Sequence, residues 1–181
     1  MIDSAPKARP RRVLVVGPSG SGKSTLAKRL SAVLGVPHVE LDVLYWGPNW
    51  TKRETFEADV AECLARDTWI VDGGFGDVKN VSWPRSELVV WLDLPFIRVL
   101  ASQFRRTVRR SLTGEELFGG NRETLRTYLL SRDSLLLWLI KSYRPTRRRH
   151  LELAAQHETV PVVRLTSRRA VDVWLASMAL R

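Results

Sequence analysis

A nine-residue stretch, residues 17–25 (GPSGSGKST), has the residue types and the spacing needed to bind phosphate. It fits the pattern G-x-x-x-x-G-K-[ST], in which glycines let backbone N–H groups converge on phosphate oxygens. Lys23 can reach the β- and γ-phosphates of a nucleotide, and the Ser24 hydroxyl can bind Mg²⁺. The nucleotide-binding residues predicted in this loop are Gly17, Pro18, Ser19, Gly20, Ser21, Gly22, Lys23, Ser24 and Thr25.

Acidic residues stand where apolar runs end, a position typical of functional carboxylates in parallel sheets. Asp42 follows the run 37–41 and could orient or deprotonate an acceptor hydroxyl, or hold Mg²⁺ through water. Asp93 closes the most apolar run, 87–92, and is a Walker-B-like candidate to bind Mg²⁺ together with Ser24. The alternative is a structural role, with Asp42 in a turn and either aspartate as a helix cap.

Two further stretches could contact an acceptor molecule. The sequence DGG at 72–74 combines a carboxylate with a close backbone approach, although a tight turn is an equal alternative. The loop 43–50 carries three aromatic residues that could stack on a ring or line a pocket, with a plain core role equally open. The predicted acceptor-binding residues are Asp42, Tyr45, Trp46, Asp72, Gly73 and Gly74.

The basic residues are unevenly distributed along the chain. Residues 105–149 contain twelve Lys/Arg and four Asp/Glu, so this segment carries +8 of the chain's formal +10. Such a surplus around a glycine-containing loop suits a lid that closes over transferring phosphates, whereas any single arginine could lie on a solvated face. We predict catalytic roles for Lys23, Asp42, Arg106, Arg109 and Arg144, and nucleotide contacts for Arg122.

The elements that must position these residues alternate between strands and helices. Strands are predicted at 12–16, 37–41, 68–72, 87–92 and 159–165. Helices are predicted at 24–34 and 96–112, and a third runs from a capping box at Thr51 to residue 66. Another is expected from a cap at Asn121 to residue 143. Pro145 separates it from a short basic helix that reaches residue 156, and a final helix follows a cap at Ser167. This order predicts an α/β domain with a mostly parallel sheet covered on both faces. Ligands of such sheets bind beyond the carboxyl ends of the strands, so the predicted site lies on one rim.

Composition limits the class of protein. The chain has 181 residues, 44% of them apolar, which suits one domain with a real core. We expect a flexible basic tail at 1–11, a single domain at 12–181 and a lid at about 105–149. Neither a signal peptide nor a membrane span is predicted, so a cytoplasmic protein is expected. The single cysteine, Cys63, lies in an apolar helical pattern and is predicted to be a core residue.

Together, several motifs resemble a known family. They are the phosphate loop, the phrase LDVLYW at 41–46 with PNW at 48–50, WIVDG at 69–73, LDLP at 92–95 and the basic lid. These stretches resemble the small adenylate-kinase-like P-loop proteins often labelled "DNA topology modulation protein". The resemblance covers roughly residues 12–175.

The resemblance implies a nucleoside-monophosphate-kinase-like three-layer sandwich whose five-stranded parallel sheet has the order 2-3-1-4-5, with an arginine-rich lid. It implies ATP and Mg²⁺ as ligands, and it places Asp42 where shikimate and gluconate kinases have the aspartate that handles the acceptor hydroxyl. Ser167, in the segment after the last strand, would contact adenine. The Pro-Arg that follows Asp-Gly-Phe in adenylate kinases, with its AMP-binding arginine, is missing after Asp72, which counts against AMP as the acceptor.

Three functions compete at this stage. The leading one is transfer of the ATP γ-phosphate to a small acceptor, by positioning and charge neutralisation. The second is a nucleotide-dependent DNA- or RNA-binding modulator with weak ATPase activity. The net charge of +10 favours this function, whereas the absence of a DNA-reading motif counts against it. The third, a GTPase switch, lacks the Asn-Lys-x-Asp phrase that binds guanine.

Overall fold

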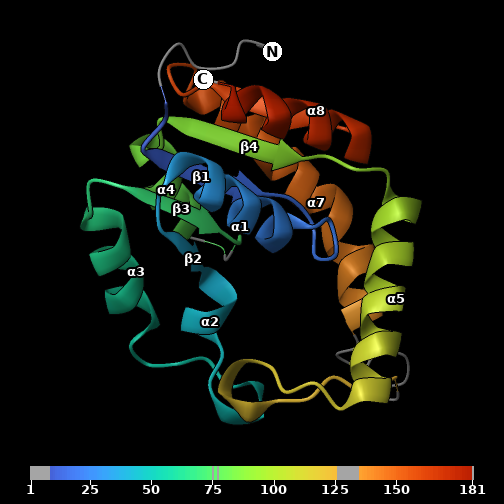
Figure 1. The fold of residues 1–181 in the computed structure, drawn as a ribbon. Coiled ribbons are helices and arrows are strands. Elements are labelled where there is room, and N and C mark those ends of the chain that lie inside the picture. The colour runs from blue at the N-terminus through green and yellow to red at the C-terminus, as the bar shows by residue number, and fades with distance from the viewer. Residues whose placement is uncertain (1–8, 75, 77, 126–134, 181) are drawn as a thin grey trace.

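The computed structural model describes residues 9–74, 76, 78–125 and 135–180. Five parallel strands form one sheet in the order β2-β3-β1-β4-β5, as predicted (Figure 1). The strands are β1 (Arg12–Val16), β2 (His38–Glu40), β3 (Trp69–Asp72), β4 (Leu88–Leu92) and β5 (Val162–Leu165). Short, apolar and β-branched runs of this kind form strands that are buried on both faces.

The register brings the ends of the strands to one edge of the sheet. Asp72 pairs with Val15 on one side and with Glu40 on the other, and Leu92 pairs with Leu165. The residues that follow each strand therefore meet along the same rim, as the sequence predicts.

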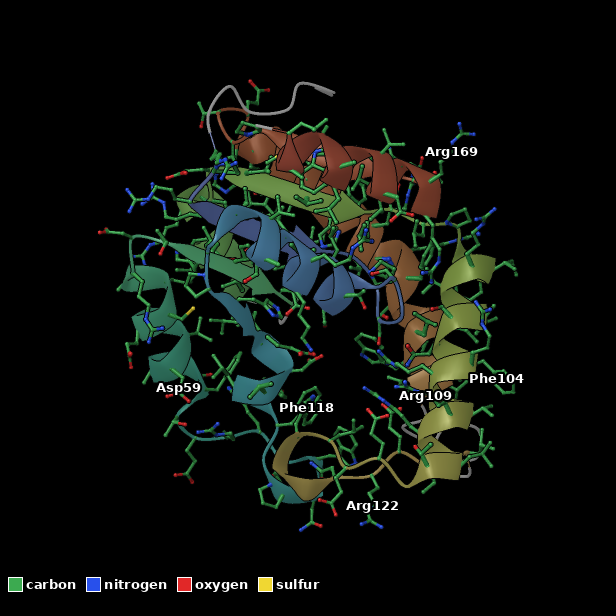
Figure 2. All side chains as sticks on the ribbon, viewed as in Figure 1. Asp59, Phe104, Arg109, Phe118, Arg122 and Arg169 are labelled. Atoms are coloured by element: carbon green, nitrogen blue, oxygen red, sulfur yellow. The ribbon has the colours of Figure 1, made fainter. Side chains whose placement is uncertain are left out.

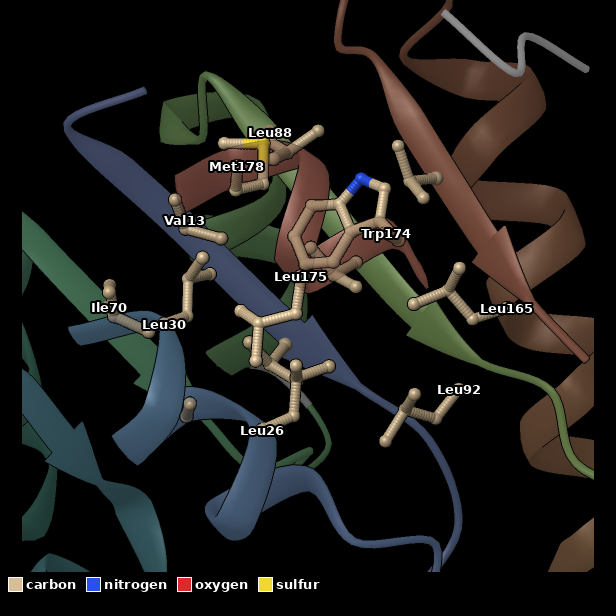
Figure 3. Packing of buried hydrophobic residues seen from close by; sticks show 14 of the residues in the cluster. Val13, Leu26, Leu30, Ile70, Leu88, Leu92, Leu165, Trp174, Leu175 and Met178 are labelled. Atoms are coloured by element: carbon tan, nitrogen blue, oxygen red, sulfur yellow. The ribbon is translucent and has the colours of Figure 1, made fainter. Parts of the chain in front are cut away.

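Helices cover both faces of the sheet, and each face has its own core. The helices are α1 (Lys23–Leu34), α2 (Leu41–Tyr45), α3 (Phe56–Ala65), α4 (Val78–Arg85), α5 (Phe96–Thr113), α7 (Leu135–Gln156) and α8 (Arg168–Ala179), with 3₁₀ turns η1 (Pro48–Trp50) and η2 (Phe118–Gly120). On one face, α1 and α8 pack Leu26, Leu30 and Trp174 against the sheet (Figure 3). On the other face, α3, α4 and α7 contribute a second cluster that contains the buried Cys63.

Two predicted boundaries around the aromatic loop are wrong. β2 ends at Glu40 and the chain turns at once into α2, so Asp42 lies in the first turn of a helix and not directly at the end of a strand. Thr51 does not cap the next helix, because its hydroxyl donates to a carbonyl oxygen of η1 at 2.7 Å and α3 begins only at Phe56.

Three predictions in the second half of the chain are also corrected. Residues 78–85, expected as loop, form α4. Asn121 is buried between two loops and does not cap a helix. Pro145 lies inside one continuous helix, α7, and does not separate two helices. Packing explains this last difference. Pro145 has no N–H group, so α7 lacks one backbone hydrogen bond there. The burial of His150 and Leu153 against the sheet stabilises the end of α7 and keeps the helix continuous.

The segment predicted as a lid, about 105–149, lies partly on two helices, and its role as a lid stays a prediction. Residues 105–113 end α5, which starts at the sheet, and residues 135–149 belong to α7, while 126–134 lie outside the described part. Most of the predicted tail, residues 1–8, also lies outside it. In the part of the chain that the structure describes, no helix has the length and apolarity to cross a membrane.

Candidate functional site

The phosphate loop joins β1 to α1, and its backbone is arranged to accept an anion. Gly22 precedes α1, and no side chain caps the helix, which leaves N–H groups of the first turn for a ligand. Gly20 has φ 80°, and a Cβ there would lie 2.7 Å from Gln103 Oε1, so only glycine fits against α5. Lys23 Nζ donates to the Pro18 carbonyl oxygen at 3.1 Å, which folds the ammonium back over the loop.

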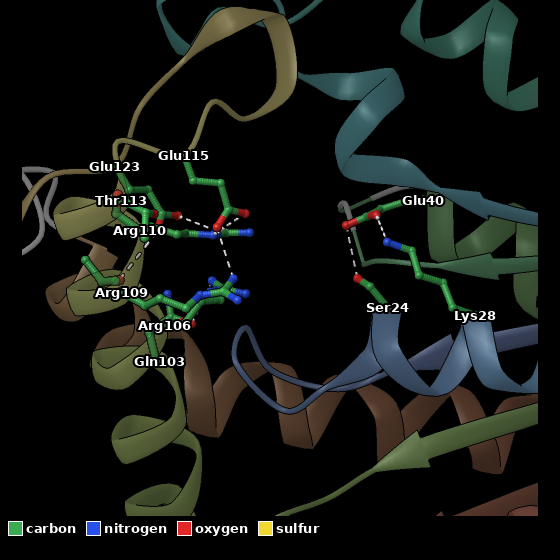
Figure 4. Close-up of polar contacts among 11 residues, drawn as sticks. Ser24, Lys28, Glu40, Gln103, Arg106, Arg109, Arg110, Thr113, Glu115 and Glu123 are labelled. Carbon is green, nitrogen blue, oxygen red and sulfur yellow. Dashed lines mark hydrogen bonds and ion pairs between the residues drawn. The ribbon is translucent and has the colours of Figure 1, made fainter.

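Ser24 contacts a carboxylate that sequence reasoning missed. Its hydroxyl donates to Glu40 Oε1 at 3.1 Å, and Glu40 Oε2 lies 3.6 Å from Lys28 Nζ (Figure 4). Glu40 is the last residue of β2, two positions before Asp42, and its place at the strand end is the signal that could have found it. Paired hydroxyl and carboxylate oxygens are a donor set suited to Mg²⁺ with its waters.

Lys23 and the rim carboxylates Asp42 and Asp72 form one electrostatic group, in which Asp72 is buried and the other two are half-buried. Burial lowers the pKa of Lys23, and the negative charges of Asp42 and Asp72 oppose that shift. Burial raises the pKa of Asp42, and the charge of Lys23 opposes that shift. Asp72 is 1% exposed, and its carboxylate contacts His38 Nε2 at 3.0 Å. The fold therefore brings the predicted residues Lys23, Asp42 and Asp72 together from three different elements.

Arg106 is the predicted lid arginine that contacts the phosphate loop directly. It donates to Gln103 Oε1 at 2.9 Å and to the Ser19 hydroxyl at 3.4 Å. Burial lowers the pKa of Arg106, with Arg110 as the next cause. In Figure 4 this arginine cluster lies on one side of the phosphate loop and the Ser24–Glu40 contact lies on the other. A bound phosphate chain would thus meet guanidinium nitrogens on one side and oxygen ligands on the other.

The other predicted arginines lie elsewhere or have acidic partners. Arg109 is exposed and donates to Glu115 at 3.0 Å. Arg122 pairs with Glu116 at 2.7 Å on the loop at the lower end of the molecule in Figure 2, away from the sheet. Arg144 lines a cavity beside the ends of β4 and β5. The structure does not bring these three to the phosphate loop, and their roles stay predictions.

Asp93 is engaged in a different charge cluster. Arg147 Nε donates to both carboxylate oxygens at 3.0 and 3.1 Å, and Arg164 Nε donates to Oδ2 at 2.8 Å. The Arg164 guanidinium also lies 4.9 Å from the centre of the Trp91 ring. Asp93 would have to leave two guanidinium groups to bind a metal beside Ser24, so its role as a magnesium ligand stays a prediction.

The aromatic loop is both core and rim. Tyr45 packs edge-on against Trp46 and Phe56, at 4.7 and 4.9 Å between ring centres, and Phe56 is buried. Trp46 contacts Trp50 at 5.5 Å, and Trp50 is 37% exposed. Tyr45 is half-buried against the core and Trp46 is also half-buried, and the acceptor-binding role of both stays a prediction.

Asn121 joins this loop to the segment after α5, a connection that the sequence does not reveal. Its amide nitrogen donates to the carbonyl oxygens of Gly47 and Phe118 at 2.8 and 2.6 Å. Its amide oxygen accepts from the Trp50 backbone N–H at 3.0 Å. One buried side chain therefore satisfies three backbone groups and fixes the two loops to each other.

Ser167 has a clear structural role. Its hydroxyl accepts from the Ala170 backbone N–H at 3.1 Å, which caps α8 as predicted. The next residue, Arg168, donates to the Ser102 hydroxyl of α5 at 3.2 Å. The segment after β5 is thereby held against α5, and its contact with a nucleotide base stays a prediction.

Comparison with known proteins supports the fold and leaves the sequence family open. No protein-family profile and no curated protein matches the chain. Among solved structures, a gluconokinase from Sinorhizobium meliloti 1021 is 18% identical, with 96% of each chain covered and a TM-score of 0.55. The shikimate kinase from Acinetobacter baumannii, solved with shikimate, is 15% identical over 94% of this chain and 92% of its own, with a TM-score of 0.52. The shikimate kinase from Bacteroides thetaiotaomicron is 20% identical over 93% and 96%, with a TM-score of 0.50.

These likenesses show that the chain has the same fold as gluconokinase and shikimate kinase. The predicted α/β class, strand order and arrangement of layers are confirmed. The resemblance to proteins labelled as DNA topology modulators rests on the sequence motifs alone.

Proposed function

We propose that the protein is an ATP-dependent phosphotransferase that moves the γ-phosphate of ATP to a hydroxyl of a small acceptor. The observation that carries the proposal is that the half-buried Lys23 and Asp42 lie within each other's field at the rim of the parallel sheet. A phosphate-binding lysine and a carboxylate, supplied by different elements, are the two groups that a transfer to a hydroxyl needs.

The phosphate loop supplies the nucleotide half of this site. The uncapped N-terminus of α1 and the predicted loop residues fit a phosphate chain, with Lys23 on one side and Arg106 on the other. Ser24 and Glu40 fit Mg²⁺, which when bound neutralises charge on the phosphates. The arrangement favours catalysis by positioned positive charge, because both cations are already partly removed from water.

Asp42 supplies the acceptor half. In the proposed transfer, the acceptor oxygen forms a bond to the γ-phosphorus while the bond to the β-phosphate oxygen breaks, and the hydroxyl proton passes to the Asp42 carboxylate. Burial raises the pKa of Asp42 and makes its carboxylate a stronger base, while the charge of Lys23 opposes that shift. Asp72, held by His38, and the adjoining Gly73 would bound the acceptor pocket.

A nucleic-acid-dependent modulator is the competing function. Much of the basic charge that favours it is paired within the described residues, as in Arg109–Glu115, Arg110–Glu123 and Arg148–Glu152. Each paired arginine contributes less to a positive surface field, but the net charge of +10 already subtracts every acidic partner and remains the argument for nucleic acid.

The deciding experiment is ADP release from Mg²⁺-ATP in the presence of a panel of acceptors. The panel holds nucleosides, nucleoside monophosphates, hydroxy acids such as gluconate and shikimate, and duplex DNA. We expect one small acceptor to raise turnover far above the rate without acceptor, and Lys23→Ala to abolish the increase. If only DNA stimulates slow hydrolysis, the modulator is the better account and the kinase proposal fails.

A further inference from the structure

Lys79, the second residue of α4, is a buried cation that the phosphate-transfer chemistry above does not use. The residue is 8% exposed, and among the described residues no carboxylate forms an ion pair with it. Among the described residues, the charged groups whose fields reach it are Lys23 and Arg149, both positive. Because an ammonium group is rarely buried without an opposite charge, the ammonium of Lys79 is suited to bind an anion from outside the chain.

The Lys79 side chain lies over the backbone that follows β3. A Cβ on Gly74 would lie 2.6 Å from Lys79 Cε and 3.0 Å from Nζ, so the lysine occupies the space above that glycine. Gly74 itself is exposed and follows Asp72 on the rim, where Asp42 and Lys23 also lie. The ammonium therefore faces the region where the proposed acceptor would bind.

The groups around Lys79 increase the cost of its charge. Burial, with the fields of Lys23 and Arg149, lowers the pKa of Lys79 to about 8. Arg149 of α7 is held nearby, because its guanidinium donates to Asn80 of α4 at 2.7 Å. The buried His150 ring, which feels the charges of Lys79 and Lys23, supplies no negative charge. An oxyanion in this position would be attracted by every cation of the group.

We infer that the acceptor carries an oxyanion, a carboxylate or a phosphate, which binds Lys79 above Gly74 while its hydroxyl binds Asp42. This inference rests on the proposed phosphotransferase function and defines its substrate class as anionic hydroxy compounds. Neutral sugars and nucleosides lack the group that would pair with Lys79.

The first test uses acceptors in matched charged and neutral pairs: gluconate with glucose, shikimate with its methyl ester, and nucleoside monophosphates with their nucleosides. We expect the preferred acceptor to be the charged member of its pair. Lys79→Met should raise the KM for that acceptor at least tenfold, and the KM for ATP should change less than threefold. Lys141→Met, an exposed lysine of α7, is the matched control and should leave both constants unchanged. A neutral acceptor that performs as well as its charged partner overturns the inference and leaves the kinase function standing.

The second test is independent of turnover. The ¹³Cε resonance of Lys79 is titrated with pH in protein saturated with ADP and Mg²⁺, with each charged compound of the panel and without it. We expect the Lys79 pKa to rise from about 8 when the bound anion pairs with the ammonium. A Lys79 that titrates near 10.5 without any ligand has an internal partner, and that result overturns the inference. A Lys79 pKa near 8 that no anion of the panel raises also overturns the inference. If no acceptor is phosphorylated and an anion still raises this pKa, the transfer function fails while the anion site stands.

Discussion

Lys79 is buried and has no ion-pair partner among the residues that the structure describes, which should make the ligand-free protein less stable at neutral pH than at alkaline pH. Burial lowers the pKa of Lys79 to about 8 in the folded protein, while the unfolded chain keeps a value near 10.5. Between these values the unfolded state binds more protons than the folded state, so the free energy of unfolding rises with pH across this window. Below about pH 8 both states are protonated and the full cost of the buried charge remains.

The size of the effect follows from the difference between the two pKa values. At about 1.4 kcal/mol for each pH unit, the difference corresponds to about 3 kcal/mol. Lys79→Met removes the charge and keeps a long apolar side chain in its place. We expect this variant to be more stable than the wild type by up to about 3 kcal/mol at pH 7, a rise in Tm of roughly 5–10 °C for a domain of this size.

The assay is urea unfolding at pH 7, 8, 9 and 10, followed by tryptophan fluorescence, for the wild type, Lys79→Met and Lys141→Met. The difference between the wild type and Lys79→Met isolates Lys79 from other groups that titrate in this range. Lys141→Met controls for the loss of one positive charge from a strongly basic chain. The reasoning is refuted if the wild type and Lys79→Met show the same dependence on pH, or if Lys79→Met is the less stable of the two at pH 7.

Four further predictions concern single side chains. Asp42→Asn should lower kcat by about 10²–10⁴ with little change in the KM for ATP, because it removes the proposed base and keeps the shape of the site; steady-state kinetics would show this. Burial between Trp83 and Trp91 lowers the pKa of His150 to about 3, so stability should fall as pH drops below 6.5, by about 2 kcal/mol at pH 5. His150→Phe should lack that loss in urea unfolding. Asn121→Ala leaves three backbone groups without their partner and should cost about 2–3 kcal/mol in the same assay. Ser167→Ala removes the cap of α8 and should cost about 1 kcal/mol, which Ser167→Thr should largely restore; calorimetry would measure both.

Much of the fold is predictable because it depends on local patterns. Short β-branched runs between amphipathic segments define the strands, and the glycine spacing at 17–22 predicts the phosphate loop between β1 and α1. The cap at Ser167 depends on residues three positions apart and is predicted correctly. The strand order came from the resemblance of several motifs to a known family, and the sheet confirms it.

The boundaries that the sequence misplaced are those where contacts between distant residues outweigh local preference. Proline at 145 predicts the end of a helix, and α7 continues because Leu153 and His150 are buried under the sheet. Asn121 looks like a helix cap, and its amide instead satisfies backbone groups of a loop more than 70 residues earlier in the chain.

The sequence by itself predicts the phosphate loop, because Lys23, Ser24 and the glycines form a pattern that depends on spacing along the chain. Only the tertiary structure decided which charges meet. It placed Arg106 at the phosphate loop, paired Arg109 and Arg122 with glutamates and tied Asp93 to two arginines. It also left Lys79 buried beside Gly74 among other cations. The physical reason is that the energy of a charge depends on its burial and on neighbours brought from distant segments, and a linear pattern contains neither.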